Sequence, residues 1–151
     1  MTNIEKYERF MLESNTIERE ERINPGDVTS VMYALNTEEW STERLFQLHE
    51  MLGGYLHEPW VGRFRTCDVY IGEGHAPEPG YLDRLMEVYV AGVGEMDSWT
   101  AHNQFEYIHP FQDLNGRMGR LIWLSKAVGE GYVFRIPFLQ MYYYQTLSRK
   151  V

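Results

Sequence analysis

The fold is decided by the stretch His109-Pro-Phe-Gln-Asp-Leu-Asn-Gly-Arg-Met-Gly-Arg120. Segments with the apolar spacing of helices flank it, over residues 99–108 on one side and from Met118 onward on the other. Pro110 predicts the end of the first helix, and Asn115-Gly116 predict a turn from which the second helix starts. The middle of this stretch is therefore predicted to be a loop that joins two helices.

The residue types in this loop favour the binding of phosphate. A helix start offers unpaired backbone N–H groups and the positive end of the helix dipole, and both attract anions. Arg117 and Arg120 lie three residues apart there, so both guanidinium groups can bind one phosphate. Asp113 is a carboxylate of the kind that holds magnesium. His109 titrates near neutral pH and can take a proton from an attacking hydroxyl, although a histidine at a helix end can also be purely structural.

The stretch resembles the signature of Fic proteins, HPFx(D/E)GNGRxxR, and the preceding Phe105-Glu-Tyr-Ile108 resembles the family's FExIHPF. The resemblance implies a mainly α, single-domain Fic fold over residues 1–151, a helical bundle with a small β-hairpin flap. It also implies a nucleotidyltransferase that moves AMP from ATP, with Mg²⁺, to a Ser, Thr or Tyr hydroxyl of a target protein. The matched signature positions are His109, Pro110, Phe111, Asp113, Asn115, Gly116, Arg117 and Arg120.

The resemblance also implies a role for each residue of the signature loop, residues 109–120. His109 is the catalytic base and Asp113 holds magnesium. Leu114 stands where the family usually has glycine, and a positive φ at this position would strain leucine and reshape the cradle. The residues expected to bind the nucleotide are Leu114, Asn115, Gly116, Arg117 and Arg120.

A second resemblance lies near the N-terminus, where residues 1–22 are expected to form an inhibitory helix. Ser14 and Glu18, four residues apart on one helical face, resemble the inhibitory motif of many Fic proteins: Ser or Thr, three residues, Glu, then Gly or Asn. The resemblance implies that Glu18 pairs with Arg120 and prevents productive binding of ATP. Arg19 replaces the usual Gly or Asn, so the helix is expected to end differently or to bind less well. The alternative is a solvated charge run that begins at Glu18.

The rest of the chain favours helices, interrupted once by an alternating pattern. Helical spacing predicts helices over residues 28–35, 45–56, 81–93 and 138–147. The alternation over residues 63–71, followed by Gly72-Glu-Gly74, predicts a short β-ribbon. The Fic resemblance makes residues 63–74 the flap that adds target backbone as an extra strand, and the alternative is a purely structural hairpin. The residues expected to dock the target are Arg65, Thr66, Cys67, Asp68 and Val69.

Composition limits the setting of this chemistry. The chain has 151 residues, 44% of them hydrophobic, which suits one globular domain. Its formal net charge of -8 argues against general nucleic-acid binding and against an anionic membrane surface. Cys67 is the single cysteine, so no intramolecular disulfide can form and a reducing cytoplasm is expected. No apolar run is long enough for a membrane span, and the sequence leaves a homo-oligomer open.

Three other functions remain open at this point. The same base and cradle could remove AMP, or transfer UMP or a whole phosphate. A non-catalytic interaction module is the second alternative, because Leu114 alters the loop. A metal-dependent hydrolase that uses His102, His109 and Asp113 is the third, although their spacing matches no zinc motif. Phe111 is expected to fill the core and His102 to be structural.

Overall fold

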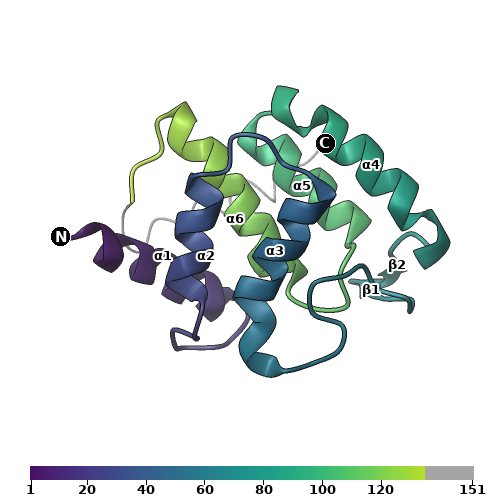
Figure 1. Cartoon of the computed structure of the whole chain (residues 1–151), viewed down its shortest axis with the longest axis horizontal. Helices are drawn as coiled ribbons and strands as arrows, with labels where there is room; N and C mark the ends of the chain where they lie inside the picture. Colours follow the sequence, from purple (N-terminus) through teal and green to yellow (C-terminus); the bar gives the residue numbers. More distant parts are fainter. Residues whose placement is uncertain (135–151) are drawn as a thin grey trace.

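The computed structural model describes residues 1–134, which contain six α-helices (Figure 1). Buried side chains, most of them from these helices, form one apolar cluster. Short 3-10 turns extend several helix ends, and the strands form one two-stranded antiparallel hairpin. The helices are α1 (Asn3–Ile17), α2 (Asp27–Leu35), α3 (Thr42–Gly53), α4 (Leu82–Gly92), α5 (Ser98–Ile108) and α6 (Asn115–Ala127). The strands are β1 (Tyr70–Ile71) and β2 (Gly74–His75), and the 3-10 turns are Gly54–Leu56, Pro79–Tyr81, Val93–Glu95 and Val128–Glu130.

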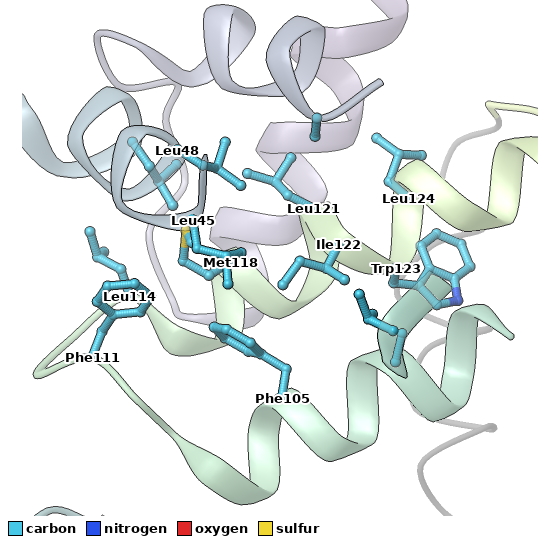
Figure 2. Packing of buried hydrophobic residues seen from close by; sticks show 14 of the residues in the cluster. Leu45, Leu48, Phe105, Phe111, Leu114, Met118, Leu121, Ile122, Trp123 and Leu124 are labelled. Carbon is cyan, nitrogen blue, oxygen red and sulfur yellow. The ribbon is translucent and has the colours of Figure 1, made fainter. Parts of the chain in front are cut away.

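Helix α6 forms the centre of the molecule. It packs against α5, α2 and α1, and its side chains are buried on nearly every side. Figure 2 shows Met118, Leu121 and Ile122 of α6 among side chains from the neighbouring elements, including Leu45 and Phe105. A helix that is buried all round belongs inside a core rather than on a surface. The start of α6, which carries the signature arginines, is therefore held rigidly.

The helix boundaries follow the local sequence. Thr2 forms a capping box with Glu5 before α1, and Ser41 and Asp97 accept hydrogen bonds from the first turns of α3 and α5. Gly26 precedes α2 with φ 88°, and a Cβ there would collide with the Met51 carbonyl. The predicted helices over residues 28–35, 45–56 and 81–93, and those that flank the signature loop, are confirmed. The helix predicted over residues 138–147 lies outside the described residues.

The predicted ribbon is wrong over most of its length. Strands cover only Tyr70–Ile71 and Gly74–His75, with Tyr70 paired to His75, and residues 63–69 contain no strand. The alternating pattern placed Phe64 and Arg65 on opposite faces, but both side chains turn inward. Phe64 packs on Phe46 with ring centroids 4.7 Å apart, and Arg65 is buried. A regular strand cannot bury two successive side chains on one side, so the chain coils there.

Candidate active site

A cavity of about 370 Å³ lies where the end of α1 meets the end of α5 and the start of α6. It gathers residues that are distant in sequence and that the sequence had singled out. The residues that line it are Ile17, Glu18, Glu106, His109, Gln112, Asp113, Leu114, Asn115, Gly116, Arg117 and Arg120. Ser14 lies behind Arg120, whereas residues 65–69 are not among the lining residues. The structure therefore brings the expected base, carboxylate, arginines and inhibitory glutamate together.

His109 ends α5 in a conformation that leaves one ring nitrogen open. Its φ is 52°, and its Nδ1 lies 3.1 Å from the backbone carbonyl oxygen of Glu106. Because a carbonyl can only accept, Nδ1 carries the hydrogen and Nε2 keeps its lone pair. Burial lowers the pKa of His109, and the positive charge of Arg65 acts in the same direction. The imidazole is therefore neutral at pH 7 and can accept a proton.

Leu114 adopts the backbone conformation that glycine would adopt. Its φ is 73°, in the left-handed region, and its backbone N–H donates to Asp113 Oδ1 at 2.7 Å. The side chain is buried in the apolar cluster with Phe111, which fills the core as expected (Figure 2). Left-handed backbone costs a leucine about 1–2 kcal/mol. The loop thus keeps the shape that glycine would give it, at the cost of local strain.

The Asn115 side chain, which the sequence placed among the residues expected to bind the nucleotide, forms its hydrogen bonds within the loop. Its Nδ2 donates to the Phe111 carbonyl at 2.7 Å, and its Oδ1 accepts from the Phe111 N–H at 3.0 Å. Both ends of the amide are therefore occupied by one backbone segment. Asn115 thus fixes the shape of the loop, and the backbone amides at the start of α6 and the two arginines are donors of the kind that bind anions.

His49 of α3 holds the signature loop in place through a hydrogen bond and a ring contact, and sequence reasoning missed it. Its Nδ1 accepts from the Gly62 N–H at 2.9 Å, so its Nε2 carries the hydrogen and donates to the Asp113 carbonyl at 3.1 Å. Its ring stacks on Phe111 with centroids 3.9 Å apart. Burial lowers the pKa of His49 to about 4, so the ring stays neutral. No local spacing linked it to a loop 64 residues away.

Arg120 is a fully buried cation held by the end of α1. Its Nε donates to Ser14 Oγ at 2.7 Å, and its Nη2 donates to the Ser14 carbonyl at 3.1 Å and to Glu18 Oε1 at 2.7 Å. The pairing of Glu18 with Arg120 that the resemblance implied is present. The Glu18 carboxylate also covers the first turn of α6, because a Cβ at Gly116 would lie 2.5 Å from its Oε1. It thus occupies the place where an anion would meet this helix start.

Arg117 is held by a second carboxylate of the same segment. Its Nη2 donates to Glu20 Oε2 at 2.9 Å, and Glu20 also accepts from Asn24 and Arg22. These donors hold the pKa of Glu20 below its usual range although burial opposes them. Sequence reasoning missed Glu20, because it follows the helix end at Glu18 and no helical spacing relates it to Ser14. Both signature arginines are therefore paired with N-terminal carboxylates.

Glu106 is an acid buried at the base of the cavity. Its Oε1 has no hydrogen bond among the described residues, although His102 Nε2 lies 4.0 Å away, and its Oε2 lies 4.0 Å from His109 Nδ1. Burial raises the pKa of Glu106 to about 8, against the opposing charge of Arg120. The carboxyl is therefore largely protonated at neutral pH. The sequence contained its signal, since Glu106 precedes His109 by three helical positions.

Asp113 fits a magnesium ion better than a transition metal. Its Oδ1 accepts from the Leu114 N–H, a bond that does not involve Oδ2, so Oδ2 is the oxygen left for a metal ion. Magnesium is commonly held by one or two carboxylates together with substrate phosphates, so a single acid beside an anion cradle suffices. Among residues 1–134 no group of three His, Cys, Asp or Glu side chains could hold a metal ion by itself. The hydrolase that would use His102, His109 and Asp113 gains no support from this geometry.

The sequence profile of the Fic/DOC family matches residues 39–124. This chain belongs to the Fic/DOC family. Relatives named protein adenylyltransferase Fic include those of Culex quinquefasciatus, with 31% identity over 97 residues, and Drosophila melanogaster, with 32% over 97 residues. The match covers 58% of this chain in both cases, but only 19% and 20% of the relatives. The chain therefore spans about a fifth of the length of the curated Fic relatives it matches.

Solved structures support the Fic fold independently. A Fic domain containing signaling protein from Bacteroides thetaiotaomicron superposes with a TM-score of 0.69 at 17% identity. The superposition covers 95% of this chain and 70% of that one. The predicted mainly α Fic fold with a small hairpin is thus confirmed. In the described part of the chain, no helix combines the length and apolarity needed to span a membrane.

Proposed function

We propose that this Fic domain transfers AMP from ATP to a Ser, Thr or Tyr hydroxyl of a target protein. One observation carries the proposal: a neutral His109 with an open Nε2 shares a cavity with both signature arginines and Asp113. The buried Nε of Arg117 has no hydrogen-bond acceptor among residues 1–134, which is a donor suited to phosphate. The Fic relatives named adenylyltransferases support the same chemistry, although the chain spans only a fifth of their length.

The reaction is an in-line displacement at the α-phosphate of ATP. His109 Nε2 takes the proton of the target hydroxyl, and that oxygen forms a bond to the α-phosphorus. The bond from the α-phosphorus to the oxygen bridging to the β-phosphate breaks, and pyrophosphate leaves. The helix start, Arg117 and Arg120 stabilise the charge on the departing phosphates. Asp113 would hold a magnesium ion, which when bound neutralises phosphate charge.

The end of α1 holds this site idle. ATP phosphates need the same guanidinium groups that Glu18 and Glu20 occupy at 2.7 and 2.9 Å. Carboxylates and phosphates compete directly for arginine because both accept paired, charge-assisted hydrogen bonds. Productive binding of ATP therefore requires the chain from Glu18 to Glu20 to withdraw.

The flap docks the target through its backbone. The exposed strand β1, with the backbone groups of residues 66–69 that Arg65 and Ala76 do not use, forms the edge for an added strand, as in other sheet-edge interactions. Arg65, which the sequence placed among the docking residues, does not contact the target through its side chain, because that side chain is buried. The exposed free thiol of Cys67 suits a reducing cytoplasm, where we place the domain.

Intact-mass spectrometry after incubation with Mg-ATP tests the proposal on the parent, Glu18→Gly, His109→Ala and the double variant. Self-modification by the mass of AMP on Glu18→Gly, lost when His109→Ala is added, is the expected result. Equal modification of Glu18→Gly and the parent would remove the inhibitory role. Adducts that form with UTP but not with ATP would reassign the transferred group. Absence of any Mg-ATP shift in melting temperature for Glu18→Gly would favour a non-catalytic module.

A further inference from the structure

We propose that Arg65 is a positioning residue, whose buried guanidinium caps α5 and ties both ends of the flap to the backbone of His109. Its Nε donates to the His109 carbonyl at 2.7 Å, and its Nη2 donates to the Ile108 carbonyl at 3.3 Å. Its own backbone N–H donates to the Pro110 carbonyl at 2.9 Å. One residue thus binds three successive carbonyls around the catalytic turn.

The same guanidinium also joins the two ends of the flap. Nη1 donates to the Cys67 carbonyl at 3.0 Å, before β1, and Nη2 donates to the Pro77 carbonyl at 2.6 Å, after β2. The Ala76 N–H donates to the Val69 carbonyl at 3.0 Å and closes the hairpin just above. A target strand that adds to the flap would therefore pair with a segment that the Arg65 guanidinium links to the backbone of His109.

Arg65 supplies α5 with the positive charge and the hydrogen-bond donors that its own last turn lacks. Helix C-termini leave carbonyls unpaired and carry a partial negative charge, which a cation stabilises. The last turn of α5 contains no basic residue of its own, and it ends at His109 in the left-handed conformation. Arg65 supplies the missing cation from a segment more than 40 residues earlier in the chain. A planar fork can satisfy several carbonyls at once, whereas a lysine ammonium cannot copy that geometry.

The Arg65 charge also acts on the His109 ring. The charged and titratable groups that face this ring are Glu106 of α5, Glu18 at the end of α1, Asp113 of the loop and Arg65. Arg65 is the cation of this set, and it lowers the pKa of His109, whereas Glu18 and Asp113 raise it. Two effects of Arg65 can therefore be separated: the fork sets the position of His109, and the charge sets its protonation.

A pair of variants separates these effects, with NMR titration of the His109 ring in nucleotide-free, magnesium-free protein as the first measurement. Arg65→Lys keeps the charge but loses the fork, and Arg65→Met loses both. We expect the pKa of His109 to rise in Arg65→Met and to stay near the parent value in Arg65→Lys. His109→Ala identifies the ring signal. Arg44→Met is the matched control, because Arg44 also donates to a backbone carbonyl, that of Glu39, but at an exposed place away from the site.

The second measurement is AMP transfer by the same variants in the Glu18→Gly background. This part rests on the proposed function, but the NMR titration does not, so failure of either is visible separately. Displacement of the base should lower kcat by about ten- to a hundredfold in both Arg65 variants, with KM for ATP little changed. Parent-like kcat in folded Arg65→Lys, or an unshifted His109 titration in folded Arg65→Met, would overturn the inference. If Arg65→Met does not fold, the kcat of Arg65→Lys decides.

Discussion

Leu114 is the residue in the site where side-chain packing and backbone strain oppose each other. Its φ of 73° costs about 1–2 kcal/mol relative to glycine. Its side chain is buried, and removal of a buried leucine side chain costs about 3–5 kcal/mol. Packing is the larger effect, so the family's usual glycine is not the more stable choice for this chain.

We therefore predict that Leu114→Gly lowers the free energy of unfolding by about 2 kcal/mol, the difference between the lost packing and the relieved strain. Urea denaturation measures the change. Gly53→Ala provides a matched partner, because a Cβ there would lie 2.7 Å from Leu114 Cδ1. It should destabilise the parent but be tolerated in Leu114→Gly. Increased stability of Leu114→Gly would mean that strain outweighs packing.

At the scale of elements, the turn at the end of α1 brings Glu18 and Glu20 to the signature arginines. The Arg19 N–H donates to the Thr16 carbonyl and the Glu20 N–H donates to the Asn15 carbonyl, both at 2.9 Å. This is a Schellman motif, whose left-handed position is usually glycine. Arg19 occupies it with φ 62°. The helix therefore ends at Glu18 with Arg19 in the left-handed position, and the turn directs Glu20 toward Arg117.

Arg19→Gly should stabilise the folded protein by about 1 kcal/mol, because it relieves left-handed strain while its higher unfolded-state entropy offsets part of the gain. The thermal unfolding midpoint should rise accordingly. Arg19→Ala, which keeps a Cβ and removes the charge, is the control and should not produce this gain. A lower midpoint for Arg19→Gly would show that the Arg19 side chain itself contributes contacts that matter.

Glu20→Gln should weaken the hold on Arg117 and raise the affinity for Mg-ATP severalfold, since it removes one charge-assisted hydrogen bond. Isothermal titration calorimetry should rank affinity in the order parent, Glu20→Gln, Glu18→Gly and the double variant. Glu21→Gln changes a neighbouring acid of the same turn and serves as the control. Parent-like affinity in Glu20→Gln would leave Glu18 as the sole competitor for the cradle.

Elements marked by proline, glycine and helical spacing could be predicted from the sequence, and those defined by distant contacts could not. Pro110 predicted the end of α5 because its ring cannot continue a helix, and Asn115-Gly116 predicted the start of α6 because this pair favours turns. The ribbon was misplaced because alternation assumes a regular strand, whereas Arg65 turns inward to carbonyls of residues 108 and 109. Local spacing contains no information about such partners.

At the scale of the whole molecule, buried ionisable groups control how stability depends on pH. Burial lowers the pKa of His49 and His102 to about 4, so the unfolded chain binds more protons than the folded chain between pH 4 and 6.5. Stability from these groups is lost as pH falls through that window. Glu106 acts with the opposite sign, because its folded pKa of about 8 lies above its unfolded value near 4.5. Its contribution is lost as pH rises toward 8.

The balance predicts maximal stability near pH 6.5, with each uncompensated proton worth about 1.4 kcal/mol per pH unit. Below this pH, the two histidines bind two more protons in the unfolded chain, which outweighs the one extra proton that Glu106 binds in the folded chain. Above this pH, only the Glu106 difference remains. Glu106→Gln should remove the decline between pH 6.5 and 8 and steepen the decline below 6.5. Urea denaturation at pH 5, 6.5 and 8 measures both limbs, with the exposed Glu87→Gln as control. An unchanged decline above pH 6.5 in Glu106→Gln would assign it to another group.

The signature loop could be predicted from the sequence because one continuous run contains its expected base, acid and arginines. The residues that hold this loop in place could not be predicted in this way. His49, Arg65 and Glu20 come from three separate segments, and each contacts the loop or its flanks across 43 to 97 residues. A single sequence contains no sign of such pairs unless they share a known motif, as Ser14 and Glu18 do.

The ion pair between Glu18 and Arg120 joins residues 102 positions apart, with the glutamate first. At synthesis rates of about 5 to 20 residues per second, Arg120 leaves the ribosome roughly 5 to 20 s after Glu18. The cradle cannot assemble before α6 emerges, and by then its competitor is already tethered to the same nascent chain. Each newly made copy therefore completes the start of α6 with the Glu18 carboxylate already beside it. Under the proposed function, ATP would meet this carboxylate from the moment of folding.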